Sequence, residues 1–284
     1  MVASEHSVRY DRTMTKQPSE RTIIITGASA GIGLAAAREL SRTDRVILVG
    51  RSKETVKLAK ELGVEYFRAD FSKLADVRNL AVELLKVCPK IDLLINNAGG
   101  VMKSITTTKD GFEQTFQVNY LAQFLLTELL MERLISSKAG IINTSSAAHM
   151  FSRLHLDDLQ FATKPFAAYA DSKLLDLIHA QELTRRYNKK GVQAVSFHPG
   201  VVATSFANTS TGPFSWLYNT SAKQILKTPA QGADTMVWLA NNRDLWLSGS
   251  YYNKRKLASI SKIAQSPTVG PFIWDQTVAL LAKT

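Results

Sequence analysis

Tyr169 and Lys173 are the pair of side chains in this sequence that most directly suggests chemistry. They lie four residues apart in a stretch with helical periodicity, so they share one face of a helix with Cβ atoms about 5 to 6 Å apart. At an effective dielectric constant near 20, an ammonium about 5 Å from a phenolate contributes roughly 3 kcal/mol. That attraction would lower a tyrosine pKa from its usual value near 10 by about two units. The pair therefore predicts a phenol whose pKa is lowered towards the working pH, so that it can exchange a proton.

Ser146 is a third polar group that can join this pair. It follows an apolar run, Gly140 to Thr144, that is typical of a buried strand. Its hydroxyl could donate a hydrogen bond to a substrate oxygen that gains charge, while the phenol gives a proton to a carbonyl or takes one from an alcohol. A serine after a strand is also a common turn residue. Because a Tyr and a Lys four apart occur by chance in many helices, the assignment needs a further signal.

The segment TGASAGIG, residues 26 to 33, supplies that signal. It lies directly after the first β-branched run and directly before a helical pattern. Glycines allow a tight turn and a close approach of backbone to pyrophosphate, and the helix N-terminus presents unpaired N–H groups and its positive dipole end. Dinucleotide folds bind phosphate at this position, so the segment predicts a dinucleotide site rather than an ordinary turn. A bound nicotinamide would exchange hydride while Tyr169 exchanges the proton.

Arg51 indicates which dinucleotide is bound. An acidic side chain near the end of the second strand would bond the ribose 2′-hydroxyl of NAD, but the sequence has Gly50, Arg51 and Ser52 there. An arginine can hold a 2′-phosphate by charge-assisted hydrogen bonds, whereas a carboxylate would repel it. The sequence therefore favours NADP(H) over NAD(H). A solvated arginine at a helix start is the alternative.

A framework that brings these residues together is visible in the hydrophobic pattern. Short β-branched runs alternate with longer amphipathic stretches, which predicts a Rossmann-type, doubly wound α/β fold: a mostly parallel, seven-stranded sheet with helices on both faces. The expected strands are Thr22 to Thr26, Arg45 to Val49, Glu65 to Arg68, Asp92 to Ile95, Gly140 to Thr144, Val192 to His198 and a last one near Gly249 to Tyr252. The expected crossover helices lie at residues 35–43, 53–63, 74–87, 111–135 and 166–190.

The chain divides into an arm and one domain. Residues 1–20 show no periodicity and are expected to form a flexible arm, and residues 21–284 are expected to form one dinucleotide-binding domain. Residues 201–228 are rich in Ser, Thr, Asn and Gly, yet include Phe214, Trp216 and Tyr218. Such a long irregular segment favours a substrate lid, with a surface loop packed on the core as the alternative.

Composition excludes several other classes. The formal charge of +11 would attract polyanions, but the basic residues are scattered through predicted helices without a DNA-reading motif, so no nucleic-acid partner is expected. Cys88 is the single cysteine, which fits a reducing cytoplasm. No run approaches the roughly 18 apolar residues of a membrane span, so no stable membrane insertion is expected. The histidines lack metal-ligand spacing, and no metal is expected.

Together these motifs resemble those of the short-chain dehydrogenase/reductase family from about residue 22 to residue 252. The matching segments are TGASAGIG, NNAG at 96–99, Asn119, Ser146, YADSK at 169–173 and PGVVAT at 199–204. SSAAHMFSRLHLDDLQ, VSFHPGVVATSF, KTPAQGA and SGSYYNKRK resemble the branch of retinol dehydrogenases and their WW-domain-bearing relatives.

The resemblance implies roles for individual residues. Tyr169 would be the acid/base, Lys173 would lower its pKa and hold the nicotinamide ribose, and Ser146 would position the substrate. Asn119 would support a proton-relay water and complete the catalytic set. Thr204 would bind the carboxamide, and Asn97 would brace the sheet. The expected cofactor-binding residues are Gly27, Ser29, Ala30, Gly31, Ile32, Gly33, Arg51, Asp70, Phe71, Asn97, Ala98, Gly99, Tyr169, Lys173, Pro199, Gly200, Val202 and Thr204.

The expected function is therefore that of an NADP(H)-dependent oxidoreductase that interconverts an alcohol and an aldehyde or ketone. The branch favours lipophilic carbonyls, and family members often form dimers or tetramers, which implies a homo-oligomer. The chain lacks the N-terminal hydrophobic anchor of many membrane-bound members, so retinoids are not carried over as its substrates. An NADP(H)-binding sensor without significant turnover is the alternative from a different class.

Overall fold

The central sheet carries the framework that the hydrophobic pattern predicts. This computed structural model describes residues 21–202 and 227–284, and its strands run in the order β3-β2-β1-β4-β5-β6-β7-β8. They are β1 (Thr22–Thr26), β2 (Arg45–Gly50), β3 (Glu65–Arg68), β4 (Leu93–Asn96), β5 (Gly140–Thr144), β6 (Gln193–His198), β7 (Tyr251–Asn253) and β8 (Lys256–Leu257). The first seven are parallel and β8 pairs antiparallel with β7. The doubly wound α/β prediction is confirmed; the count of seven missed β8, which is too short for a detectable alternation.

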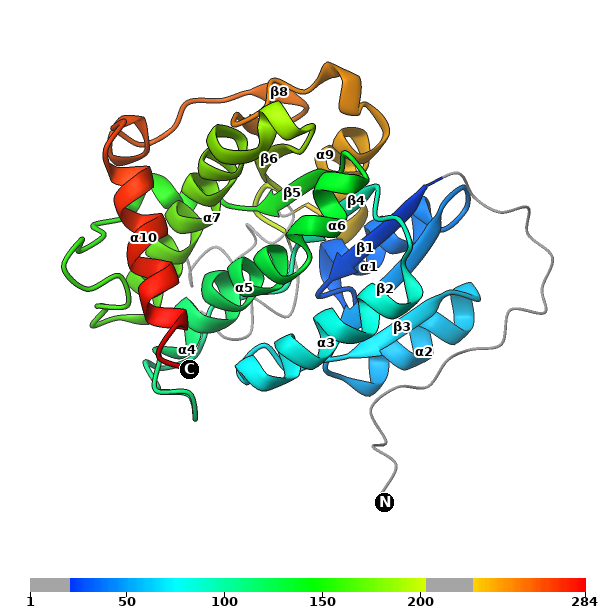
Figure 1. Cartoon of the computed structure of the whole chain (residues 1–284), viewed down its shortest axis with the longest axis horizontal. Helices are drawn as coiled ribbons and strands as arrows, with labels where there is room; N and C mark the ends of the chain where they lie inside the picture. Colours follow the sequence, from blue (N-terminus) through cyan, green and yellow to red (C-terminus); the bar gives the residue numbers. More distant parts are fainter. Residues whose placement is uncertain (1–20, 203–226) are drawn as a thin grey trace.

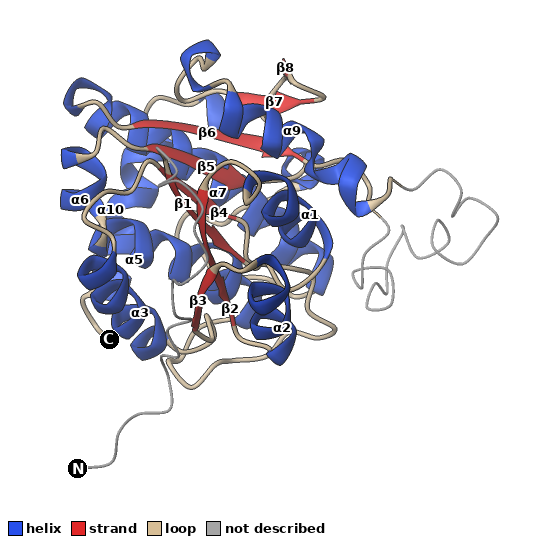
Figure 2. Cartoon of the chain, turned by 90° about the vertical axis from the view of Figure 1, so that its right-hand side faces the viewer, coloured by secondary structure: helices blue, strands red, loops and turns tan. Residues whose placement is uncertain are grey.

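Helices cover both faces of this sheet (Figure 2). One face packs against α1 (Gly31–Leu40), α2 (Lys53–Leu62) and α9 (Pro229–Asn241). The other packs against α3 (Leu74–Val87), α5 (Ala122–Leu129), α7 (Pro165–Tyr187) and α10 (Val269–Leu281). The strands are therefore apolar on both sides: Ile23 and Ile25 enter one core, and Ile24 between them enters the other.

The helical stretch expected at 111–135 is not one regular helix. It comprises α4 (Gln114–Phe116), the π-helical turn η1 (Gln117–Leu121), α5 and α6 (Met131–Ser136). It begins at 114 because the Glu113 carboxylate accepts hydrogen bonds from the N–H groups of Thr115 and Phe116. The short 3₁₀ segments are η2 (Ala147–Phe151), η3 (Asn188–Lys190), η6 (Arg243–Leu245) and η7 (Ile263–Gln265).

Helices α9 and α10 were not among the predicted crossover helices. A capping box at Thr228 and Gln231 begins α9. Helix α10 packs against α7 (Figure 1), and its Thr277 Oγ1 forms a 2.8 Å hydrogen bond with the Tyr120 hydroxyl of η1. The predicted arm, residues 1–20, and residues 203–226 of the predicted lid lie outside the described residues.

Candidate active site

Asn97 joins the carboxyl ends of three neighbouring strands. Its Nδ2 donates to the carbonyl of Thr26 at 2.9 Å, and its N–H donates to Thr26 Oγ1 at 2.9 Å. Thr144 Oγ1 donates to Asn97 Oδ1 at 3.3 Å. These bonds tie β4 to β1 and β5, as expected of a residue that braces the sheet. The strand order reverses between β1 and β4, and ligands of doubly wound sheets bind at such an edge.

The glycine-rich segment forms a tight turn at this edge. Gly27 has φ +68°, and a Cβ there would lie 2.6 Å from Ala98 Cα, so glycine is required on both conformational and steric grounds. Helix α1 starts at Gly31, its N-cap Ala30 provides no side-chain cap, and its first turn holds no acidic residue. The N–H groups of that turn, which includes Ile32, suit an anionic phosphate, and Ser29 lies just before the turn.

Arg51 follows β2 with its side chain 68% exposed. Its Nη1 lies 3.9 Å from Asp70 Oδ1, and its carbonyl accepts a 3.3 Å hydrogen bond from Arg68 Nη2. The guanidinium is therefore only loosely paired and accessible to a ligand. The Phe71 side chain is buried in the hydrophobic core. Its expected contact with a cofactor stays a prediction.

Ser146, which lies just after β5, comes together with Tyr169 and Lys173 of α7. A side-chain hydrogen bond joins Tyr169 and Ser146, and Lys173 Nζ lies 5.7 Å from the centroid of the Tyr169 ring. Lys173 Nζ also donates to the Thr144 carbonyl and to Asp176 Oδ2, each at 2.8 Å. Ser146 Oγ accepts from the N–H of Ala148 at 3.2 Å. Its turn-forming role and its place beside Tyr169 therefore coexist.

The protonation of Tyr169 differs from the expectation. Burial raises the pKa of Tyr169, and the Asp176 carboxylate raises it further, while Lys173 and the Ser146 hydrogen bond lower it. The net pKa lies above the usual tyrosine value. The predicted net lowering was therefore wrong, because desolvation and the Asp176 carboxylate oppose the attraction of Lys173.

Asn119 links the loop after β4 to α7. Its side chain exchanges two 3.0 Å hydrogen bonds with the backbone of Gly100 and donates to Ser172 Oγ at 3.0 Å. A Cβ at Gly99 would lie 2.8 Å from Asn119 Oδ1 and 3.6 Å from Lys173 Nζ. Asn119 and the Lys173 ammonium therefore both lie beside this loop. A proton-relay water at Asn119 stays a prediction.

The segment after β6 closes the same edge. Pro199 and Gly200 follow the strand, and Lys227 Nζ donates to the Pro199 carbonyl at 3.3 Å. Val202 pairs with Lys227 in an isolated bridge, and Thr204 lies outside the described residues. Sequence reasoning missed Lys227 and Asp176. The three-residue spacing from Lys173 to Asp176 was a signal for the second, whereas no local signal pointed to Lys227.

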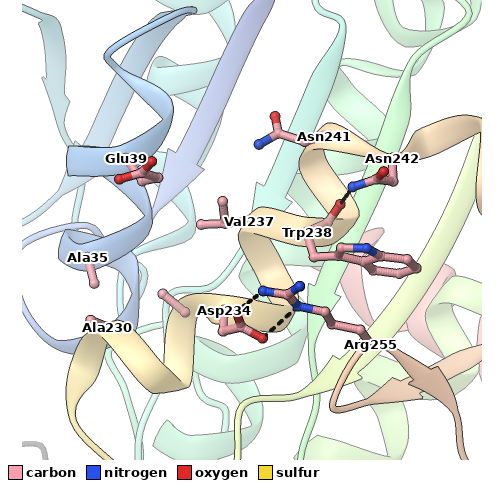
Figure 3. A pocket seen from close by; sticks show the side chains of 10 residues that line it. Ala35, Glu39, Ala230, Asp234, Val237, Trp238, Asn241, Asn242 and Arg255 are labelled. Carbon is pink, nitrogen blue, oxygen red and sulfur yellow. Dashed lines mark hydrogen bonds and ion pairs between the residues drawn. The ribbon is translucent and has the colours of Figure 1, made fainter.

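A separate groove runs between α1 and α9 (Figure 3). Its volume is about 430 Å³, and Ala35, Glu39, Val237, Trp238 and Arg255 are among its lining residues. Its Asp234 carboxylate is paired with the Arg255 guanidinium. It contains none of the predicted catalytic residues, so the edge around Tyr169 remains the candidate site.

Two further features of residues 21–202 and 227–284 bear on the kind of site. These ranges contain no cluster of three or more His, Cys, Asp or Glu placed to hold a metal ion. They also contain no helix with the length and apolarity needed to cross a membrane.

Comparisons with known proteins show the family of this chain. A family model described as short chain dehydrogenase matches residues 21–212. The chain is 39% identical over 276 residues to the candidate daunorubicin C-13 ketoreductase DnrU of Streptomyces sp. (strain C5), covering 93% of each. It is 34% identical over 286 residues to human retinol dehydrogenase 13, covering 92% of this chain and 84% of the relative.

A solved structure extends the agreement to three dimensions. The crystal structure of an uncharacterized protein from Mycobacterium Paratuberculosis is 30% identical, with a TM-score of 0.74 over 93% of this chain and 94% of the other. Motifs, site geometry and relatives thus agree over most of the chain. It belongs to the short-chain dehydrogenase/reductase family of oxidoreductases, within the retinol dehydrogenase branch.

Proposed function

We propose that this protein is an NADP(H)-dependent oxidoreductase that interconverts a lipophilic alcohol and its aldehyde or ketone, with Tyr169 as general acid/base. The observation that carries the proposal is the Ser146–Tyr169 hydrogen bond with Lys173 Nζ 5.7 Å from the tyrosine ring. The relatives named above support the substrate class, because one is named for a ketone and the other for an alcohol.

The residues at the sheet edge fit a phosphorylated dinucleotide. The uncapped first turn of α1 suits the pyrophosphate, and the exposed Arg51 suits a 2′-phosphate. Lys173 would hold the nicotinamide ribose. Its ammonium donates two hydrogen bonds, to Thr144 and Asp176, and its third N–H could be donated to a ribose hydroxyl. When bound, the nicotinamide supplies or accepts a hydride.

The protein's own residues handle the proton. In reduction, the Tyr169 hydroxyl donates its proton to the substrate oxygen while the carbonyl carbon receives hydride. Ser146 orients that oxygen by a hydrogen bond, and the Lys173 ammonium stabilises the phenolate that remains. In oxidation the phenolate takes the hydroxyl proton of the alcohol, so the same residues serve both directions.

The test begins with titration of the full chain with NADPH and NADH, followed by reduced-cofactor fluorescence. A panel of aliphatic, aromatic and terpenoid aldehydes and ketones is then added. Tyr169→Phe is expected to lower kcat by about 10²- to 10⁴-fold, because the general acid is removed, while NADPH affinity is retained. Tyr187→Phe is the matched control: it lies on the same helix, but its hydroxyl contacts Glu128, and it should keep wild-type turnover.

Near-normal turnover by Tyr169→Phe would show that the acid/base role is wrong. NADPH binding without turnover on any carbonyl in the panel would favour the sensor alternative. Failure to bind either cofactor would refute the assignment of the Gly27–Gly33 loop and, with it, the proposed reaction.

A further inference from the structure

Asp176 is a buried carboxylate to which the proposed reaction assigns no role. It lies on α7, three residues after Lys173, and its Oδ2 accepts a 2.8 Å hydrogen bond from Lys173 Nζ. The side chains of Lys173 and Asp176 are only 5% and 4% exposed. Solvent and salt therefore screen this ion pair little. The ammonium that would stabilise a Tyr169 phenolate is thus already in contact with another anion.

The surroundings of Asp176 leave Lys173 as its charged partner within the described residues. On α7, Tyr169 and His179 are the other titratable groups nearby, and burial lowers the pKa of His179 to about 3, which keeps it neutral. From η1, Tyr120 interacts with Asp176, and burial raises the pKa of Tyr120. From β5, Asn143 donates to the Asp176 main-chain carbonyl at 3.0 Å. Tyr251 is a buried phenol that interacts with Tyr169, and burial raises the pKa of Tyr251.

The carboxylate acts on Tyr169 as well as on Lys173. Asp176 contributes to raising the pKa of Tyr169, against the lowering by Lys173. Burial also raises the pKa of Asp176 itself to about 6, with Lys173 opposing that rise. The acid is therefore largely ionised above neutral pH, where it weakens the lysine's electrostatic pull on the phenol.

We propose that Asp176 is a positioning residue that holds the Lys173 ammonium against Thr144 and offsets part of its charge, so that Tyr169 keeps its proton and is set for carbonyl reduction. This inference rests on the proposed function, since it gives Asp176 a purpose only if Tyr169 is the proton donor. The geometry that carries it is the contact of one buried ammonium with Asp176 and Thr144, next to the Tyr169 ring.

The test is the pH dependence of the full-length Asp176→Asn variant. Because Asp176 raises the pKa of Tyr169, its neutralisation should lower that pKa. Reduction needs the protonated phenol, so the alkaline fall of kcat with NADPH should move to lower pH. The tyrosinate absorbance of Tyr169 should titrate with the same shift. It is the part of the absorbance that Tyr169→Phe removes, measured once in the wild type and once in Asp176→Asn.

Asp171→Asn is the matched control on the same helix. The Asp171 carboxylate is also buried, but it accepts hydrogen bonds from Ser152 Oγ at 2.6 Å and the N–H of Arg153 at 3.1 Å. This variant should lose stability without moving either titration. Asp176→Glu keeps the negative charge and should restore a pH profile close to that of the wild type.

An unshifted titration in folded Asp176→Asn, or an equal shift in Asp171→Asn, would overturn the inference. If Asp176→Asn does not fold, Asp176→Ser is measured instead, because it removes the charge and leaves room for water. Absence of wild-type turnover on every carbonyl would count against the proposed function, whereas the tyrosinate absorbance would still decide whether Asp176 controls Tyr169.

Discussion

Tyr169 is poised between opposing electrostatic effects. Desolvation and Asp176 favour the protonated phenol, while Lys173 and Ser146 favour the phenolate. The raised pKa means that the proton is present at neutral pH, which suits its donation to a carbonyl. Oxidation of an alcohol would require the ionised form and should therefore gain rate as pH rises. Under the proposed function, the same site would therefore favour reduction at lower pH and oxidation at higher pH.

At the scale of one side chain, the proposed preference for NADPH rests on Arg51. Arg51→Ala should weaken NADPH binding about 10- to 100-fold, because a hydrogen bond to a charged group contributes about 1.5 to 3 kcal/mol. NADH, which lacks the 2′-phosphate, should bind almost as before. Fluorescence titration measures both affinities. Arg42→Ala is the control, since Arg42 is 71% exposed and pairs with Glu39 on α1; equal losses for NADPH and NADH in Arg51→Ala would contradict the assignment.

Among the elements, the π-helical turn η1 positions the Asn119 side chain. It carries Asn119, whose amide reaches both Gly100 and Ser172. A π-turn inserts an extra residue into the helical path and is common at functional sites. Here it joins the loop after β4 to α7, so that the loop beside the glycine-rich segment and the helix carrying Tyr169 are held together.

Helix α7 also carries a buried histidine that should govern acid stability. His179 packs with ring centroids 5.0 Å from Phe124 and 6.0 Å from Trp274, and burial lowers its pKa to about 3 from 6.5. Between these values the unfolded chain binds a proton that the folded chain does not. The free energy of unfolding should therefore fall as pH drops below 6.5, by up to about 1.4 kcal/mol per unit.

The variant His179→Gln isolates this contribution. Relative to the variant, the wild type should lose about 2 kcal/mol of unfolding free energy between pH 7 and pH 5, measured by urea unfolding at each pH. A constant difference between wild type and His179→Gln over this range would argue that His179 is not kept neutral by burial.

At the scale of the whole molecule, cofactor binding should couple to folding. A ligand bound only by the folded state at 100 times its Kd adds about 2.7 kcal/mol of stability, which corresponds to about 5 to 10 °C in Tm for a chain of this size. NADPH should produce this shift in a thermal unfolding experiment, and NADH at the same concentration should produce about half or less. Equal shifts would contradict the proposed preference for the 2′-phosphate.

Much of this architecture could be predicted from short stretches of the sequence. Each of the seven predicted strands is present, because two-sided burial of parallel strands leaves β-branched apolar runs such as Ile23 to Ile25. The glycine turn at Gly27 and the shared helical face of Tyr169 and Lys173 follow from local backbone geometry. The prediction was weaker for the two-residue β8 and for the turn at Asn119, because short or irregular elements have little periodicity.

The order of motifs and their spacing determined the fold class and the candidate trio Ser146, Tyr169 and Lys173, since backbone conformation and side-chain alternation are local properties. The tertiary structure decided what surrounds those residues: the burial of Phe71 in the core, the Lys227 contact with Pro199, and the Asp176 carboxylate beside the Lys173 ammonium. It also decided that the pKa of Tyr169 is raised. Desolvation and charge depend on which distant segments pack over a group, and that information is absent from any local stretch of sequence.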